Sequence, residues 1–167
     1  TRGFVGSGPN QELVGGFVLM GEPGSQKGII AKGVAQYMSS LPEFSGGGLL
    51  DDPKITLQDI VGKKVAVNDN WQTFSSLDSN DDISTLTASY DPSVIASETY
   101  SAYRNELNNV STASAMFISL DVMSAEQAAT LAGNSAYAGY ALYTAVVTSS
   151  SGSSGVAQVA IEDPDRN

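Results

Sequence analysis

The chain contains neither cysteine nor histidine, so neither a disulfide bond nor an ordinary zinc site can hold its fold together. A hydrophobic core must therefore supply the stability. With 167 residues the chain is long enough for one such core and too short for two large domains, so we expect a single domain. Only 16% of the residues are charged, against about 25% in an average globular protein, and small or uncharged polar residues fill the difference.

The same absence limits the chemistry that the chain can perform. Nucleophilic catalysis of the Ser-His-Asp or Cys-His type needs an imidazole to carry the proton. The sequence also lacks a Ser-x-x-Lys nucleophile motif. No spacing singles out a pair of carboxylates for glycoside chemistry. We therefore expect a protein that is not an enzyme.

The charge balance restricts the partners. Eight Lys and Arg against eighteen Asp and Glu give a net charge of -10, and no basic run occurs in the chain. Nucleic acids and anionic membrane surfaces repel such a protein, so we expect it to bind no nucleic acid. No stretch reaches the roughly 18 apolar residues of a membrane span, so we expect no membrane insertion.

Composition favours a location outside the cell. The chain begins at Thr1 and not at Met, which suggests either a processed product, whose lost segment could be a secretion signal, or a shortened form of the protein. Ser, Thr, Gly and Asn are abundant, and acidity favours solubility. Asn109, Val110 and Ser111 form an acceptor sequon for N-glycosylation, which matters only if the chain is exported through a glycosylating system and is not itself evidence of export. We predict an extracellular or cell-surface protein.

The first half of the chain contains signals of both secondary-structure types. Residues 1–12 are predicted to form an extended N-terminal arm, and residues 13–167 a single α+β domain. Residues 13–20 are an apolar run typical of a strand. Residues 25–41 are predicted to form an amphipathic helix, capped by Ser25, with an apolar stripe at helical spacing. The members of this stripe are Ile30, Val34, Tyr37, Met38 and Leu41.

The middle of the chain is more polar. Residues 43–60 are predicted to be a loop, with a short helical turn near residues 57–61, and residues 64–67 a brief strand. The segment 68–90 is expected to be a long surface excursion with Trp71 as one of its anchors. Asp91 and Pro92 are typical of a helix start, and a stripe of apolar residues after them predicts a helix to about residue 110.

The last third gives the clearest strand signals. Residues 116–122 are predicted to be a strand, and Ser124 with Gln127 fits a capping box that opens a short helix ending at Gly133. Residues 140–148 and 156–161 are predicted to form a hairpin, the first strand being apolar on both faces and therefore central. The expected fold is α+β: a mainly antiparallel sheet with a C-terminal hairpin, packed against two or three amphipathic helices.

One segment resembles a known phosphate-binding element. Residues 17–38 read FVLMGEPGSQKGIIAKGVAQYM, an apolar run, a glycine-rich turn and a predicted helix. This segment resembles the P-loop of the adenylate kinase family, and the resemblance implies that Gly21, Gly24 and Lys27 would cradle phosphate. It departs from that pattern at Gln26, in place of the last glycine, and at Gly28, where a Ser or Thr would hold magnesium.

A second motif points to calcium. Asp78, Asn80 and Asp82 place oxygen ligands at alternate positions, as in the first half of a calcium-binding loop, and Asp81 adds a carboxylate. The EF-hand pattern is incomplete, because Ile83 occupies the glycine position and Ser89 the position of the closing glutamate. A site of this kind would need further donors, for which the candidates are Asp51, Asp52, Asp163 and Asp165.

These observations favour a structural function. We predict a subunit that self-assembles into an extracellular filament, sheath or shell, a homo-polymer whose main partner is itself. The N-terminal arm is expected to act as the strand that joins one subunit to the next. Two alternatives remain open: an extracellular ligand-binding or adhesion module that uses Trp71 and the loop 68–90, and a phosphate- or nucleotide-binding enzyme that uses a degenerate P-loop.

Overall fold

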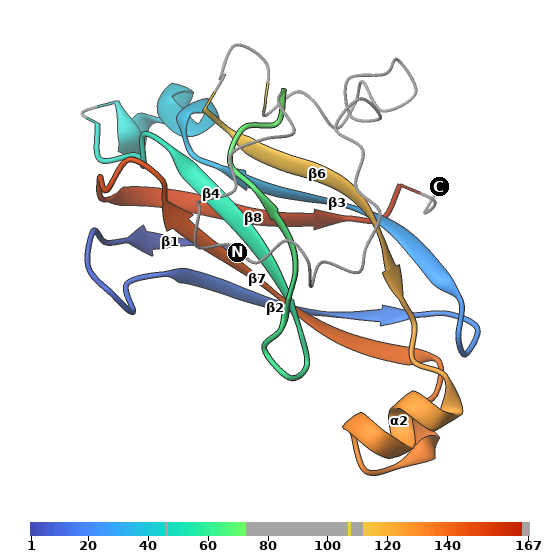
Figure 1. Cartoon of the computed structure of the whole chain (residues 1–167). Helices are drawn as coiled ribbons and strands as arrows, with labels where there is room; N and C mark the ends of the chain where they lie inside the picture. Colours follow the sequence, from blue (N-terminus) through green and yellow to red (C-terminus); the bar gives the residue numbers. More distant parts are fainter. Residues whose placement is uncertain (46, 73–106, 108–111, 165–167) are drawn as a thin grey trace.

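The computed structural model describes residues 1–45, 47–72, 107 and 112–164, and these residues are mostly in β-strands (Figure 1). Eight strands form two four-stranded antiparallel sheets. We call the sheet with the order β1-β8-β3-β6 sheet A, and the one with the order β2-β7-β4-β5 sheet B. The strands are β1 (Arg2–Val5), β2 (Leu13–Met20), β3 (Gln26–Val34), β4 (Pro53–Asp59), β5 (Lys64–Asn68), β6 (Ser114–Asp121), β7 (Tyr140–Ser149) and β8 (Gly155–Glu162).

The strand pairing is nested. Strand β1 pairs with β8, β2 with β7, β3 with β6 and β4 with β5. The first three of these pairs alternate between sheets A and B, as a long hairpin does when it is rolled up around a core. Eight strands in two sheets with this winding form a jelly roll, an architecture shared by viral capsid, lectin and cupin domains.

The main core lies between the two sheets. Alternate residues of each strand point into this space, because successive side chains of a strand lie on opposite faces. Sheet A contributes Ile29 and Ala31 from β3 and Met116, Ile118 and Leu120 from β6; sheet B contributes Leu13 and Leu19 from β2, Ile55 and Leu57 from β4, and Ala145 and Val147 from β7. Most of the contributing side chains of both sheets are aliphatic, which suits close packing of two sheets about 10 Å apart.

A second apolar cluster covers the outer face of sheet A. Ile30 and Val34 of β3 and Ala115 of β6 point away from the main core, and Trp71 and Leu107 pack on them. Trp71 is only 7% exposed, and its backbone amide donates to the carbonyl of Ala113 at 2.9 Å. Sheet A is therefore buried on both faces around the middle of β3.

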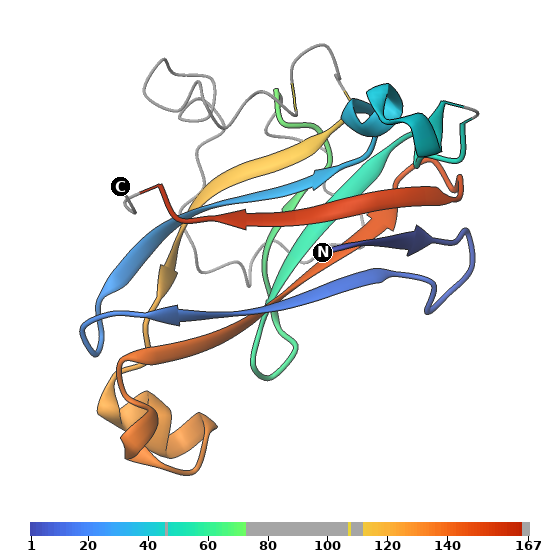
Figure 2. The same cartoon turned by 180° about the vertical axis from the view of Figure 1, so that it is seen from behind.

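The predicted α+β architecture is wrong. The described residues contain a single α-helix of seven residues, α2 (Ala125–Leu131), and short 3₁₀ turns at Gln36–Ser40, Pro42–Phe44 and Ser135–Tyr137. The sheets pack on each other and not on two or three amphipathic helices. The 3₁₀ turns of residues 36–44 and α2 lie at opposite ends of the sandwich (Figure 2).

The predicted helix over residues 25–41 is mostly strand β3. Residues four apart, such as Ile30 and Val34, share a face in a strand as well as in a helix. Two glycines decide between these structures, because glycine weakens a helix and here lets neighbouring side chains approach. A Cβ on Gly28 would lie 2.9 Å from the Phe117 ring, and one on Gly33 would lie 2.6 Å from Ser114 Oγ.

The C-terminal strands are confirmed, but their pairing is not. Strand β7 and strand β8 occupy the predicted segments, yet they belong to different sheets and form no hairpin. The connection between them crosses from sheet B to sheet A. Strand β7 is central, between β2 and β4, as its two apolar faces predict. The predicted loop and helical turn over residues 43–61 are also wrong in part, because Pro53–Asp59 forms β4.

Local signals predict several elements correctly. Strands β2, β5 and β6 coincide with the apolar runs. The capping box is present: the amide of Gln127 donates to Ser124 Oγ at 3.2 Å, and the amide of Ser124 donates to Gln127 Oε1 at 2.8 Å. Gly133 has a φ of +68°, which suits a position just after a helix. The helix predicted from Pro92 to about residue 110 lies, except for Leu107, outside the described residues.

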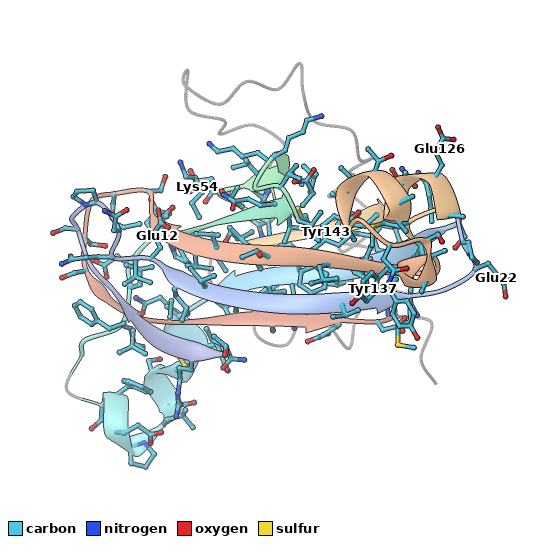
Figure 3. The ribbon with its side chains drawn as sticks, turned by 90° about the horizontal axis from the view of Figure 1, so that it is seen from below. Glu12, Glu22, Lys54, Glu126, Tyr137 and Tyr143 are labelled. Atoms are coloured by element: carbon cyan, nitrogen blue, oxygen red, sulfur yellow. The ribbon has the colours of Figure 1, made fainter. Side chains whose placement is uncertain are left out.

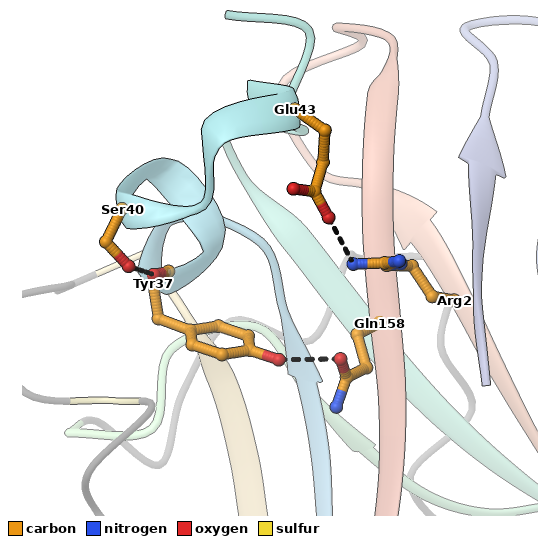
Figure 4. Close-up of polar contacts among 5 residues, drawn as sticks. All are labelled: Arg2, Tyr37, Ser40, Glu43 and Gln158. Carbon is orange, nitrogen blue, oxygen red and sulfur yellow. Dashed lines mark hydrogen bonds and ion pairs between the residues drawn. The ribbon is translucent and has the colours of Figure 1, made fainter. Parts of the chain in front are cut away.

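The predicted N-terminal arm contains strand β1. Arg2–Val5 pairs with Gly155–Gln158 of β8 in the same chain, and residues 6–12 connect it to β2. Arg2 forms an exposed ion pair with Glu43 at 3.6 Å (Figure 4). Beside it, Tyr37 Oη donates to Gln158 Oε1 at 2.6 Å and so ties the 3₁₀ turn to β8.

Candidate self-association surface

Strand β2 is at a sheet edge and has no polar side chain, two features that rarely occur together in a monomeric protein. Among the strands that the structure describes it is at the edge of sheet B, with a neighbouring strand on one side only. Its eight residues, LVGGFVLM, include no charged or hydrogen-bonding side chain. Soluble proteins usually protect long edge strands with charged residues, proline or bulges. An unprotected edge strand of this kind is a candidate site for association.

The outward face of β2 is apolar and exposed. Val14, Val18 and Met20 point away from the core and are 54%, 54% and 61% exposed. An antiparallel sheet with one face in solvent usually has polar residues on that face. In β2 both of the alternating sets of residues are apolar or glycine.

The neighbouring strand extends this apolar surface. In the register of β2 with β7, Val18 lies opposite Leu142 and Met20 lies opposite Tyr140. Leu142 is 44% exposed and Tyr140 is also exposed. Cross-strand neighbours on one face of a sheet touch, so these side chains form one patch. We call Val14, Val18, Met20, Tyr140 and Leu142 the β2/β7 patch.

Two adjoining grooves continue the patch across sheet B. The first, of about 330 Å³, is lined by Val18, Leu142 and Ile60, the last from the turn between β4 and β5. The second, of about 230 Å³, is lined by Leu142, Ile60 and Leu131 of α2. Ile60 and Leu131 are exposed apolar residues as well. The surface is therefore shaped by four elements: β2, β7, the turn between β4 and β5, and α2.

Two acidic residues flank β2. Glu12 precedes the strand and Glu22 follows it by two residues, and both are exposed. Figure 3 shows them at opposite ends of the strand. Charges at the rim of an apolar surface oppose indiscriminate association and control its register. Between them the strand itself carries no charge.

An aromatic pair packs behind the patch, on the core side of sheet B. Phe17 of β2 and Tyr143 of β7 stack on the core side of sheet B, with ring centroids 5.8 Å apart. Tyr143 Oη donates to the carbonyl oxygen of Asp121 at 2.9 Å. Burial and, to a lesser extent, the carboxylates of Asp121 and Asp59 raise the pKa of Tyr143 to about 12. The tyrosine therefore stays neutral and acts as a fixed packing element.

The segment that resembles a P-loop has a different structure. Gly21 and Gly24 lie in the turn between β2 and β3, and Lys27 is the second residue of strand β3. No helix follows this turn, so no helix N-terminus faces it. Lys27 Nζ forms an ion pair with Asp163 at 2.7 Å, beside an open cavity of about 550 Å³ between β2 and the end of β8. The arrangement that would cradle phosphate is absent from this part of the described chain.

A buried lysine lies on the outer face of sheet A. Lys32 of β3 is only 2% exposed, and its ammonium group pairs with Glu162 at the end of β8. A buried charge needs such a partner, because removing it from water is costly. The pair fixes the end of β8 against β3. Sequence analysis did not single out Lys32, because its burial follows only from the cover over sheet A.

The predicted calcium ligands are only partly described. Asp78, Asn80, Asp81, Asp82 and Asp165 lie outside the described residues. Of the other candidate donors, Asp163 is engaged by Lys27, whereas Asp51 and Asp52 precede β4 at the far end of sheet B. Among the described residues no group of three or more acidic side chains is arranged to hold a metal ion.

The alternative functions lose some of their structural support. Trp71, expected to line a contact surface, is buried against sheet A. Within the described ranges every helix is too short or too polar to cross a bilayer. The residues of the β2/β7 patch were predicted as a strand but not as a surface. An apolar run of this kind suits a buried strand equally well, and only the strand order shows that β2 is at an edge.

No protein-family model, no curated protein and no solved structure matches this chain in the three comparisons. The function is therefore inferred from the fold and from the geometry of the surface.

Proposed function

We propose that this chain is the structural subunit of a shell, which it forms by self-assembly through the β2/β7 patch. Of the filament, sheath and shell predicted from the sequence, the jelly roll favours the shell, because this fold recurs in viral capsids. That part of the argument is an analogy at the level of fold. An extracellular location of the assembly remains a prediction from composition.

The single observation that carries the proposal is the unprotected edge strand β2. Its outward residues Val14, Val18 and Met20 are at least half exposed, and its backbone edge has no strand beside it in sheet B. Full burial of a Val, Leu or Met side chain stabilises by about 1.5–3 kcal/mol, so each of these half-exposed residues would contribute about 1 kcal/mol on association. A second copy that covers the patch would bury these side chains and could hydrogen-bond with the free backbone edge of β2.

The N-terminal strand offers a second contact. Strand β1 is held to β8 by only four residue pairs, and the connection after it contains Gly6, Gly8 and Pro9. Exchange of β1 between two copies would repeat the same pairing on the neighbour's β8, which is a low-cost route to joined subunits. This contact would supplement the patch and is not needed for it.

The experiment compares Val18→Asp with Ser151→Asp. Both variants add one negative charge at an exposed position, but Ser151 is in the loop between β7 and β8 and outside the patch. We expect Val18→Asp to raise the protein concentration at which assemblies form by about 100-fold, since a carboxylate would be buried without a partner at a cost of about 3 kcal/mol. Ser151→Asp should change it by less than about threefold.

Analytical ultracentrifugation gives the assembly state, and negative-stain microscopy distinguishes a closed shell from a filament. Circular dichroism and thermal melting show that both variants are folded. Equal assembly of the two variants contradicts the proposal. So does a wild-type chain that stays monomeric at high concentration in both low and high salt.

A further inference from the structure

Two aspartates lie near each other at the end of sheet B where β4 begins and β5 ends. Asp52 immediately precedes β4, and Asp69 immediately follows β5. Strands β4 and β5 are neighbours, and Ile55 pairs with Asn68 close to this end. The sheet therefore brings together two carboxylates that are 17 positions apart in the sequence.

Both carboxylates have an oxygen that is buried and unsatisfied. Asp69 is only 7% exposed, and neither its Oδ1 nor that of Asp52 has a hydrogen-bond partner. Buried carboxylate oxygens in folded proteins are almost always hydrogen-bonded, paired with a cation or bound to a metal. The unsatisfied oxygens therefore indicate a missing positive partner.

The electrostatic surroundings point in the same direction. Burial raises the pKa of Asp52, and the negative charges of Asp69 and Asp51 raise it further. Neighbouring carboxylates thus oppose the ionisation of Asp52. A bound cation would remove this repulsion.

Hydrogen bonds from neighbouring elements fix the chain around the two aspartates. The amide of Ser150 donates to the carbonyl of Asp52 at 2.8 Å, and Thr112 Oγ1 donates to the carbonyl of Asp51 at 2.8 Å. On the other side, Asn68 Nδ2 donates to the carbonyl of Asn70 at 3.1 Å, and Asn68 Oδ1 accepts from the amide of Ala115. The chain on either side of the two aspartates is therefore fixed by neighbouring elements.

We propose that Asp52 and Asp69 bind a hard divalent cation of the calcium type. Calcium takes six to eight oxygen ligands, and water and main-chain carbonyls commonly complete a set that has few carboxylates. Two carboxylates with water also suit magnesium, so the ion is the hard divalent class and the experiment separates the two members. This site is distinct from the loop with Asp78, Asn80 and Asp82. It needs no assembly and is tested on dilute protein, independently of the proposed function.

The position of the only tryptophan gives a direct readout. Trp71 is two residues from Asp69, and the chain contains no other tryptophan. Terbium occupies calcium sites, and a nearby excited tryptophan transfers energy to it. We expect sensitised terbium emission on excitation of the wild-type protein, with displacement by calcium at lower concentrations than by magnesium if calcium is the preferred ion.

Thermal melting supplies the second readout. We expect calcium at about a hundredfold above its Kd to raise the melting temperature of the wild type by about 5–10 °C. Asp69→Asn and Asp52→Asn should each abolish that rise and the terbium emission. Without metal, each should melt at the wild-type temperature or above it, because the substitution removes one of two repelling charges. Loss of binding in a variant that remains stable separates ligation from misfolding.

Glu126→Gln is the matched control, since it removes one exposed carboxylate from α2, which precedes the Tyr140 end of β7, whereas Asp52 lies beside the Ser149 end (Figure 3). It should keep both responses. The proposal is overturned if wild-type protein shows neither response to terbium or calcium, or if the two Asn variants respond like the wild type. It is also overturned if Asp78→Asn abolishes the responses and Asp69→Asn retains them.

Discussion

Both sheets of this molecule have apolar residues on their outer faces, but the outer face of sheet B is buried only in part: Thr56, Val67 and Val146 are covered, whereas the β2/β7 patch is not. On sheet A, Trp71 and Leu107 pack on Ile30 and Val34. On sheet B, the β2/β7 patch remains in solvent, with Val18 and Met20 more than half exposed. The difference teaches that apolar outer residues on a strand do not by themselves indicate a surface for partners. What matters is whether the same chain supplies the cover.

The largest effect on the free energy of unfolding is expected from removing the side chain that covers the outer face of sheet A. Trp71→Ala should lower the free energy of unfolding by about 3–5 kcal/mol, since it leaves a cavity over β3 in a buried cluster. Denaturant unfolding of dilute protein without metal measures this effect. Val18→Asp under the same conditions should change the unfolding free energy by less than about 1 kcal/mol, because its side chain is already exposed. Similar losses in the two variants would mean that the two outer faces do not differ.

A smaller effect, on assembly, is expected from replacing one apolar side chain of the patch on strand β7. Leu142→Ser removes an exposed apolar side chain opposite Val18. It should weaken assembly about tenfold, equivalent to about 1.4 kcal/mol of lost apolar burial, and leave the monomer's melting temperature almost unchanged. Sedimentation at several protein concentrations measures the shift. An unchanged assembly with Leu142→Ser would confine the contact to the β2 edge.

The smallest effect should come from the charges at the ends of β2. Replacing both Glu12 and Glu22 with Gln removes repulsion between copies and should strengthen assembly about twofold to fivefold at low salt. The gain should shrink at high salt, where exposed charges are screened. Light scattering across a salt series follows this change. Weaker assembly of the double variant would show that these glutamates form attractive contacts.

Sequence patterns predicted local structure better than the arrangement of the strands. The capping box at Ser124 and the apolar runs of β2 and β7 depend on neighbouring residues, and all three are confirmed. The predicted helix failed because Ile30 and Val34 fit either period, and the weight of Gly28 and Gly33 was missed. The C-terminal hairpin failed because the partner of each strand is set by the winding of the whole chain.

The candidate sites show the same difference between local sequence patterns, which are predictable, and the arrangement of strands, which is not. The apolar character of β2 is visible in the sequence, but its position at a sheet edge is a property of the strand order. Asp52 was considered as a calcium donor from its acidity, whereas Asp69 was not. No periodicity links these two residues, and only the antiparallel pairing of β4 with β5 brings them together.

The nested pairing affects the order in which the strands of a newly made subunit pair during folding. The β4–β5 pair closes the shortest loop, and each pair outside it spans more of the chain, ending with Arg2 opposite Gln158. Contacts between residues so distant in sequence cost the most chain entropy and form slowly. A newly made copy would therefore complete β1 last, and until then the open edge of β8 could accept the corresponding segment of a neighbour.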